Sequence, residues 1–273
     1  MPELPEVETV VRALALRLVG RTLGRLTVWQ PSVLETEEDA VRRFTVGARV
    51  AATRRRGKWI LLDLDNGQTI LLHLRMTGRL TVLAGRTPKE RHDHVEWLLA
   101  SGPECFRFND PRRFGRLRLM PTSDIEAYFA GRGFGPEPLQ VDFAEFHRRL
   151  GKGKRSIKAA LLDQSVVAGI GNIYADETLF RAGIDPRLLT LRLGPVRAQR
   201  LHAAMKAVLT RAIAARGTSL RNYQTPDGSR GEFQGELAVF RRTGAPCPSC
   251  GRRVRRIKLV GRSTHFCPRC QRR

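Results

Sequence analysis

Four cysteines near the C-terminal end constrain the fold of this chain more than any other feature. They form two Cys-x2-Cys pairs separated by sixteen residues: Cys247 with Cys250, and Cys267 with Cys270. Two such pairs can place four thiolates tetrahedrally around one Zn2+. The alternatives are two disulfides or free thiols, but the first residues lack the features of a secretion signal. The spacing therefore predicts one structural Zn2+ that leaves no coordination position open for a catalytic water.

The segment between the two cysteine pairs is strongly basic, with five arginines and a lysine from Arg252 to Arg262. A small hairpin held by zinc can present such side chains to phosphates or to a groove. Spacing alone does not decide whether Arg262 contacts a phosphate. His265, two residues before Cys267, is a competing metal ligand, although the four-cysteine set is simpler.

The charge of the whole chain points to a polyanionic partner. Lys and Arg number 49 against 26 Asp and Glu among 273 residues, a formal net charge of +23. A field of this sign attracts polyanions. The excess is mostly arginine, whose planar guanidinium suits phosphate, and this favours nucleic acid over an anionic membrane. No stretch reaches the roughly 18 apolar residues of a membrane span, and we expect a cytoplasmic protein.

The hydrophobic pattern changes along the chain. A first helix is predicted from Val7 to Leu18, and Gly20 ends it. Residues from about 22 to 120 contain short strand-like runs at 59–64, 69–74, 78–83, 94–99, 105–109 and 116–119, which favours a β-sandwich or barrel. The first two runs are separated by the hairpin residues 65–67. A Gly- and Pro-rich linker spans residues 131–138. Further helices are predicted over residues 143–150, 156–162, 172–182 and 195–217.

The N-terminus carries a candidate nucleophile. Pro2 is small enough for Met1 to be removed, which would expose a secondary amine. An α-amino group titrates near about 7.7–8.0, so a fraction is unprotonated at neutral pH. Attack of this amine on a sugar C1′ would give an iminium, as in Schiff-base catalysis. Glu3 and Glu6 are close in sequence and could act as acid or base.

Five ordered motifs, spread over the full length of the chain, resemble the formamidopyrimidine-DNA glycosylase family. They are residues 1–9 together with Lys58, residues 73–78, residues 110–115, residues 169–177 and the C-terminal cysteine cluster. The resemblance implies an α+β multidomain fold: an N-terminal β-sandwich with an N-terminal helix, a helix–two-turn–helix module and a four-cysteine zinc-finger β-hairpin. The expected divisions are 1–131, a linker region 132–150, 151–236 with a lesion-covering loop 218–233, and a zinc finger 237–273.

The same resemblance implies roles for individual residues. Pro2 would be the nucleophile, Glu3 the acid/base, and Lys58 a catalytic residue near the lesion and its phosphates. Met76, Arg112 and Phe114 match the trio that fills the DNA where the damaged nucleotide leaves, since flipping costs a few kcal/mol. The remaining DNA contacts implied by the family are His73, His92, Arg113, Lys158, Asn172 and Arg262. Glu177 looks like a buried structural partner of the helical module.

The implied activity is that of a bifunctional DNA glycosylase/AP lyase in base excision repair. It would excise oxidised purines such as 8-oxoguanine and formamidopyrimidines from duplex DNA and then cut by β,δ-elimination, with Zn2+ as the only cofactor. Its partner would be duplex DNA with oxidised bases or abasic sites, and the protein would be a monomer. One alternative is the related endonuclease-VIII-like branch, which acts on oxidised pyrimidines. Another is a non-enzymatic zinc-ribbon DNA-binding protein, which would leave the Pro2–Glu3 start unexplained.

Overall fold

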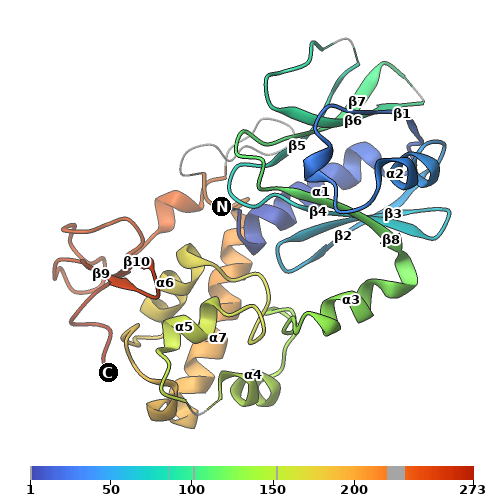
Figure 1. The fold of residues 1–273 in the computed structure, drawn as a ribbon. Coiled ribbons are helices and arrows are strands. Elements are labelled where there is room, and N and C mark those ends of the chain that lie inside the picture. The colour runs from blue at the N-terminus through green and yellow to red at the C-terminus, as the bar shows by residue number, and fades with distance from the viewer. Residues whose placement is uncertain (1, 86, 101, 152, 220–230) are drawn as a thin grey trace. The chain divides into compact units, whose positions relative to one another are not determined.

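The computed structural model describes residues 2–85, 87–100, 102–151, 153–219 and 231–273. Contacts divide the chain into two compact units (Figure 1). The first unit comprises Met1–Ala130 with Arg216–Gly231, and the second comprises Gly131–Ala215 with Glu232–Arg273. No helix in the described ranges is both long and apolar enough to cross a membrane.

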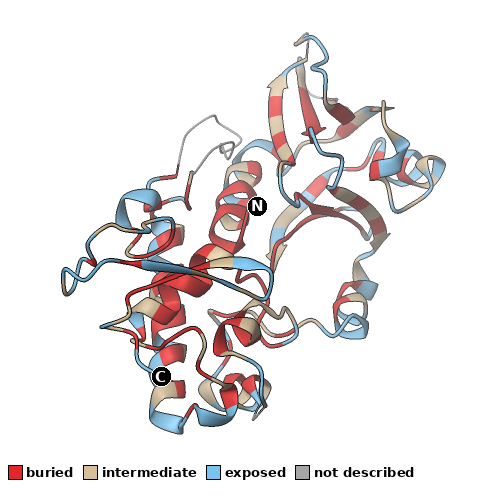
Figure 2. Cartoon of the chain, turned by 60° about the vertical axis from the view of Figure 1, so that its left-hand side comes forward, coloured by how far each residue is buried: buried red, intermediate tan, exposed pale blue. Residues whose placement is uncertain are grey.

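Two antiparallel four-stranded sheets form the body of the first unit, with strand orders β1-β6-β7-β5 and β2-β3-β4-β8. Their strands are β1 (Leu23–Val28), β2 (Val50–Arg56), β3 (Trp59–Leu64), β4 (Gln68–His73), β5 (Arg79–Ala84), β6 (Asp93–Leu99), β7 (Glu104–Asn109) and β8 (Arg116–Pro121). Buried and less buried residues alternate along β5 and β8, as expected for strands with one face on a core (Figure 2). One hydrophobic core draws on both sheets, so the unit is a β-sandwich.

Helix α1 (Leu4–Leu18) adds its apolar stripe to that core. Val7, Val10, Leu14 and Leu18 are buried and recur at helical spacing. The hydroxyl of Thr53 on β2 donates to the Val11 carbonyl at 3.2 Å, which fixes the helix against the second sheet. Two shorter helices complete the unit: α2 (Glu38–Thr45) and α3 (Ile125–Gly131).

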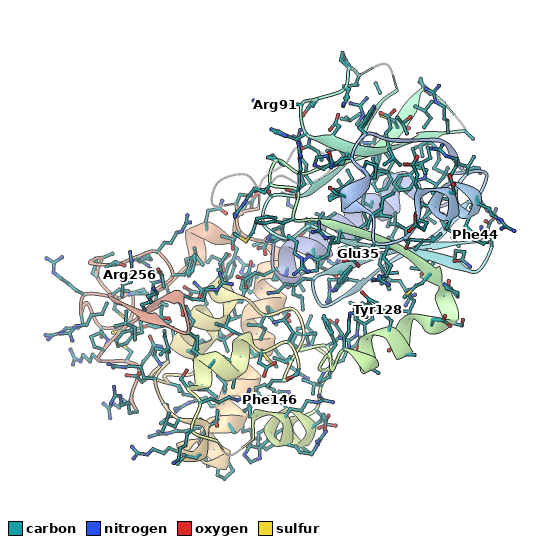
Figure 3. The ribbon with its side chains drawn as sticks, in the orientation of Figure 1. Glu35, Phe44, Arg91, Tyr128, Phe146 and Arg256 are labelled. Carbon is teal, nitrogen blue, oxygen red and sulfur yellow. The ribbon has the colours of Figure 1, made fainter. Side chains whose placement is uncertain are left out.

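The described residues of the second unit form four α-helices, two short 3-10 turns and a small hairpin. The helices are α4 (Phe143–Leu150), α5 (Ile157–Leu162), α6 (Asn172–Arg181) and α7 (Pro195–Ala214). Asp142 and Ser156 cap α4 and α5 by accepting hydrogen bonds from backbone N–H groups three residues on. The hairpin pairs β9 (Arg255–Leu259) with β10 (Arg262–Phe266). Its exposed side chains include Arg256, which extends away from the ribbon (Figure 3).

The fold class expected from the sequence is confirmed. Six of the eight strands of the sandwich and helices α1 and α4–α7 lie where the sequence patterns predict them. The sequence analysis did not identify β1, β2, α2 or α3. The two compact units are a coarser division than the four expected segments: the linker, most of the helical module and the zinc finger fall in the second unit, and residues 216–231 group with the sandwich. The four expected segments stay a prediction.

Candidate active site and DNA-binding residues

The carboxylate of Glu6 connects the N-terminal residues to the segment that follows α7. One oxygen, Oε2, accepts a hydrogen bond from the backbone N–H of Glu3 at 2.8 Å. The other, Oε1, accepts from the backbone N–H of Thr218 at 2.7 Å. Glu6 is only 2% exposed and Glu3 only 3% exposed. A single buried carboxylate thus fixes the start of α1 and the first residues of the predicted lesion-covering loop.

Gly217 makes this close approach possible. A Cβ at this position would lie 2.7 Å from Oε1 of Glu6, and the backbone φ is +78°, a conformation that favours glycine. Residues 220–230, most of the predicted lesion-covering loop, lie outside the described residues. The sequence analysis considered Glu6 only as an acid or base and did not foresee this connection.

Lys58 lies in the two-residue turn between β2 and β3 and is only 7% exposed. The neighbouring Arg55 orients this turn, because its guanidinium donates to Glu8 of α1 at 2.8 Å and to the Gly57 carbonyl at 3.1 Å. Burial would raise the pKa of Glu8, but hydrogen bonds from Arg55 and Arg12 lower it below its ordinary value. The resulting ion pair joins the first half of α1 to the turn that carries Lys58.

His73 ends β4 directly opposite Trp59, whose ring it meets edge-on. Its Nδ1 accepts the backbone N–H of Arg75 at 2.9 Å. Burial, followed by the positive charges of Arg75 and Lys58, lowers the pKa of His73 to about 3. The imidazole is therefore neutral at physiological pH, and with Nδ1 as acceptor, Nε2 carries the proton. Such a ring can donate one neutral hydrogen bond to a phosphate.

Asp110 organises the two loops that carry the predicted wedge residues, and it is fully buried. Its carboxylate accepts hydrogen bonds from the Thr77 hydroxyl at 2.5 Å and from the backbone N–H groups of Arg112 at 3.2 Å and Gly115 at 2.7 Å. Its carbonyl oxygen lies 2.7 Å from Nε2 of the buried His94. Asp110 thereby holds the loop after β4 against the loop after β7. The sequence analysis included this residue in a motif but assigned it no role.

The wedge residues project from this platform. Met76 is 39% and Phe114 is 47% exposed, unusually high for large apolar side chains. The Arg112 guanidinium stacks over the Phe114 ring at 4.6 Å. Two loop residues adopt positive φ, Arg75 at 51° and Arg113 at 57°, and such strain is typical of functional loops. The structure therefore brings Met76, Arg112, Arg113 and Phe114 together on one platform.

His92 has a different environment from His73. Its side chain is partly exposed, and its backbone carbonyl accepts the N–H of Asp110 at 3.0 Å. This backbone contact places residue 92 next to Asp110 at the base of the same platform. Its contact with DNA remains a prediction.

Lys158 occupies a different position from the one expected, because it is fully buried in the second unit. Its ammonium donates to Asp176 at 2.6 Å, to the Thr264 hydroxyl at 2.9 Å and to the Ser263 carbonyl at 3.2 Å. A direct contact with the DNA backbone is not available to this group in the structure. The expectation of such a contact is corrected: Lys158 fastens α5 and α6 to β10.

Asn172 begins α6 and faces the same strand. Its amide nitrogen donates to the Ser263 carbonyl at 2.9 Å, and its side-chain oxygen is buried without a partner among the described residues. Arg262, the first residue of β10, is exposed just after the hairpin turn. The structure thus places Asn172 and the hairpin that carries Arg262 next to one another.

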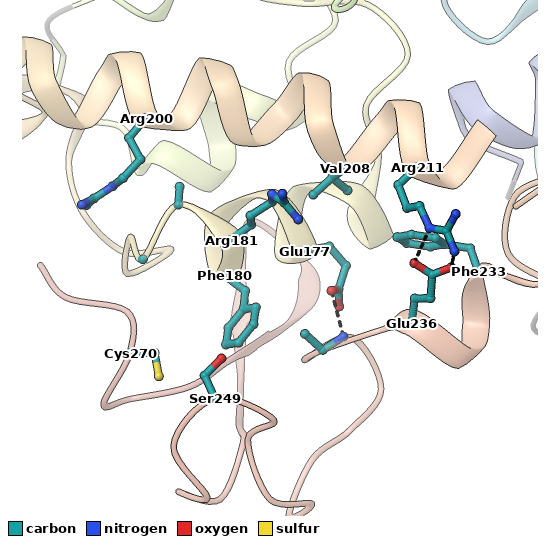
Figure 4. A pocket seen from close by; sticks show the side chains of 13 residues that line it. Glu177, Phe180, Arg181, Arg200, Val208, Arg211, Phe233, Glu236, Ser249 and Cys270 are labelled. Carbon is teal, nitrogen blue, oxygen red and sulfur yellow. Dashed lines mark hydrogen bonds and ion pairs between the residues drawn. The ribbon is translucent and has the colours of Figure 1, made fainter. Parts of the chain in front are cut away.

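Glu177 is a structural anchor, in agreement with the sequence analysis. Its carboxylate accepts backbone hydrogen bonds from Ala238, Val239 and Phe240 at 2.8–3.0 Å, and Figure 4 shows a hydrogen bond to Glu177 as a dashed line. Burial raises the pKa of Glu177, and these three bonds oppose that shift. The contacts hold the segment leading to the zinc finger against α6.

The four C-terminal cysteines form the predicted metal site. All four Sγ atoms lie within 4.8 Å of one another. The separations are 3.8 Å between Cys247 and Cys270 and 3.5 Å between Cys250 and Cys267. Zn–S bonds of about 2.3 Å imply tetrahedral S–S edges of roughly 3.8 Å, whereas a disulfide needs about 2.05 Å. The donor set therefore fits one structural Zn2+ and excludes the disulfide alternative.

His265 is not part of this metal cluster. Its Nδ1 lies 3.2 Å from a carboxylate oxygen of Asp176, and the same oxygen accepts the His265 backbone N–H at 2.9 Å. Asp176 therefore receives hydrogen bonds from both Lys158 and His265. The four cysteines are therefore the candidate metal ligands, and His265 does not compete with them.

The sandwich with its N-terminal helix, the helical module and the four-cysteine hairpin together define a zinc-finger DNA-repair protein. Family models match residues 1–117 as the formamidopyrimidine-DNA glycosylase N-terminal domain, 134–224 as its H2TH domain and 244–273 as the zinc finger found in FPG and IleRS. The chain belongs to the formamidopyrimidine-DNA glycosylase family, whose members have glycosylase and AP lyase activities, and it is an enzyme of that kind.

Individual relatives agree over the whole chain. Formamidopyrimidine-DNA glycosylase of Desulfitobacterium hafniense is 46% identical, covering 99% of this chain and 100% of its own. A Lactococcus lactis FPG mutant in complex with Fapy-dG-containing DNA is 36% identical, with a TM-score of 0.95 and full coverage of both chains. A MutM structure in complex with carbocyclic 8-oxo-G containing DNA is 35% identical, with a TM-score of 0.93 and the same coverage.

Proposed function

We propose that this protein excises oxidised purines from duplex DNA and cleaves the resulting abasic site through a Schiff base on Pro2. The observation that carries the proposal is the pair of hydrogen bonds to Glu6, because they fix the Glu3 and Thr218 backbones on one carboxylate. A nucleophile at residue 2 would then lie beside the segment that covers the damaged base. This arrangement supplies the positioning that covalent catalysis requires.

The proposed first stage is displacement of the base. After removal of Met1, the secondary amine of Pro2 attacks C1′ and then gives up its N–H proton. The glycosidic bond breaks with its electron pair going to the departing base, which takes up a proton. Opening of the C1′–O4′ bond converts the adduct into an iminium, and the ring oxygen takes up a proton. Glu3 is the proposed donor and acceptor for these transfers.

The proposed second stage breaks the strand on both sides. Loss of a C2′ proton expels the 3′ phosphate, and loss of a C4′ proton from the conjugated product expels the 5′ phosphate. Addition of water to the remaining iminium and release of a proton free Pro2 as its amine. Lys58 and neutral His73 are the proposed phosphate contacts near this site, with Asn172 and Arg262 as contacts from the second unit.

The purine preference rests on the wedge platform and the two solved complexes. Met76, Arg112 and Phe114 would fill the gap left by the extruded nucleotide and satisfy the orphaned base opposite. The two structures described above hold Fapy-dG and carbocyclic 8-oxo-G, which are purine lesions. We propose a monomer located in the cytoplasm, with duplex DNA as its partner.

Single-turnover excision tests this proposal. Duplexes carrying one formamidopyrimidine, one 8-oxoguanine or one oxidised pyrimidine are compared with undamaged DNA. Excision of both purine lesions with phosphate at both ends of the gap is expected. A clear preference for the pyrimidine lesion would assign the protein to the endonuclease-VIII-like branch, and binding of damaged DNA without any excision would refute the enzymatic proposal.

A further inference from the structure

A surface cavity in the second unit is lined by an unusual group of arginines. It measures about 800 Å3 and lies between the start of α7, the residues after α6 and the second cysteine pair. It adjoins the cavity of Figure 4 and shares four residues with it: Gly183, Arg200, Ser249 and Cys270. No Asp or Glu is among its lining residues. We call it the arginine cavity after Arg197, Arg200, Arg269 and Arg272.

These arginines have no acidic partner within the described part of the chain, although nearby arginines do. Asp185 pairs with Arg187 at 2.6 Å, and Glu236 pairs with Arg211 at 2.8 Å. Like charges gathered in one cavity repel each other unless an anion neutralises them. The local supply of carboxylates is thus already used by other guanidiniums.

The zinc centre compensates only part of this charge. A Zn2+ ion with four thiolates carries a net charge of about −2, and two of its ligands, Cys250 and Cys270, line the cavity. Four guanidiniums carry +4, so a surplus of about two positive charges remains. Electrostatic balance of the zinc site therefore does not account for all four arginines.

The chain holds the arginines in place from two directions. Arg197 and Arg200 are one helical turn apart on α7. The backbone of Arg272 is fixed on both sides, because its N–H donates to the Gly183 carbonyl at 3.1 Å and its carbonyl accepts the N–H of Asp185 at 3.0 Å. The backbone of the site is therefore fixed before a ligand binds, and binding orders only the arginine side chains.

Phosphate is the ligand chemistry that these groups match best. The planar guanidinium donates two parallel hydrogen bonds to phosphate oxygens, and the volume lies within the range of about 300–1,000 Å3 typical of small-ligand sites. We propose that the arginine cavity is a second phosphate site, which binds two or more linked phosphate groups. Their source is either a DNA strand outside the lesion contacts or a free oligophosphate.

The cavity is separate from the predicted DNA contact at Asn172. Asn172 begins α6, while Gly183 of the cavity lies just beyond its end. Ten helical residues at about 1.5 Å each place the two ends roughly 15 Å apart. The same pair of adjacent phosphates cannot occupy both places.

Calorimetry with inorganic tripolyphosphate tests the site in the zinc-loaded, full-length protein. The double variant Arg197→Ala/Arg200→Ala is compared with Arg192→Ala/Lys206→Ala, which removes two positive charges from the same unit outside the cavity. We expect tripolyphosphate binding to weaken at least about tenfold in the cavity variant, since charge-assisted hydrogen bonds are lost. The control variant should bind like the parent, and thermal unfolding verifies that both variants fold.

A second experiment tests whether the phosphate groups come from DNA. It measures how binding to a short and to a long undamaged duplex depends on salt. Each lost phosphate contact lowers the slope of log K against log salt by about 0.9. A lower slope for the cavity variant on the long duplex alone would identify DNA as the source, and loss of tripolyphosphate binding alone would identify a free oligophosphate. The proposal is overturned if neither effect occurs, if the control variant shows the same loss, or if a decaglutamate peptide binds more tightly than tripolyphosphate.

Discussion

At the scale of single residues, the structure gives two residues of the candidate site, Glu6 and His73, defined buried environments. Glu6 accepts backbone hydrogen bonds with both carboxylate oxygens, and these bonds keep it in place as a positioning group. His73 is held neutral by burial and by neighbouring positive charge. Neither property is visible in the composition of the motifs, because both depend on which backbone groups and charges surround the side chain.

Replacement of Glu6 by glutamine tests its positioning role. Glu6→Gln keeps one acceptor oxygen but turns an amide N–H2 toward a backbone donor, so we expect a loss of about 1–3 kcal/mol in the free energy of unfolding. Misplacement of the reacting groups should lower the single-turnover excision rate by about 10²-fold. Glu37→Gln, an exposed glutamate of the same unit, is the matched control. Equal losses in both variants would show that Glu6 has no special position.

The neutral state of His73 predicts a specific pH dependence. Its folded pKa of about 3 lies below the ordinary value of 6.5, so the unfolded chain binds the extra proton between these values. The stability from His73 is then complete above pH 6.5 and is lost as the pH falls below it. The His73→Asn variant should therefore lose less stability than the parent on acidification. An NMR midpoint for the His73 ring near 6.5 would contradict this account.

At the scale of elements, Asp110 joins the loop after β4 to the loop after β7. We expect Asp110→Asn to cost about 3 kcal/mol of folding stability, since a buried charged acceptor of three hydrogen bonds is replaced by a neutral amide. Base eviction, followed by fluorescence of 2-aminopurine next to the lesion, should slow about tenfold. Cleavage of a preformed abasic site should change little, because that substrate has no base to evict.

Asp124→Asn, on an exposed turn, is the control for this experiment. Equal losses of base eviction and abasic-site cleavage in Asp110→Asn would show only a damaged fold. That result would exclude a positioning role for the loops.

The buried ion pair of Lys158 and Asp176 holds the zinc-finger hairpin against the helices. Its contribution to the free energy of unfolding can be predicted. Lys158→Met leaves the Asp176 carboxylate without its ammonium partner and should cost about 3–5 kcal/mol. Lys158→Met/Asp176→Asn should recover much of that stability, because the neutral amide oxygen can still accept the His265 backbone N–H. Urea unfolding measures both variants. If the double variant is as unstable as the single one, the hydrogen bonds to Ser263 and Thr264 contribute more than the charge balance.

The sequence predicted the structure well where residues close together in the chain determine it. The cysteine spacing predicted the zinc ligands, the residues 65–67 predicted the β3–β4 hairpin, and α4 begins and ends at the predicted residues. β2 was missed because its sequence, Val50–Arg56, has three consecutive arginines and lacks apolar alternation. The burial of Lys158 was missed because it depends on Asp176 and Thr264, which are distant in sequence. The motifs named the candidate residues, but only tertiary contacts revealed Glu6 and Asp110 as their supports.

At the scale of the whole molecule, a net charge of +23 attracts a polyanion such as DNA and speeds its association with the protein. The sandwich unit contains the candidate nucleophile, the acid/base and the wedge platform. The helical unit contains Asn172, the zinc hairpin and the arginine cavity. The central claim is that these parts act on DNA through a covalent intermediate at residue 2.

Borohydride trapping tests that claim most directly. The untagged protein is incubated with a duplex carrying 8-oxoguanine opposite cytosine, reduced with borohydride, and compared with Pro2→Gly and with a form extended at its N-terminus. Our account predicts a covalent protein–DNA adduct that maps to Pro2 and is lost in the extended form, which still binds DNA. An adduct that maps to Lys58, or no adduct while DNA binding is intact, would contradict it.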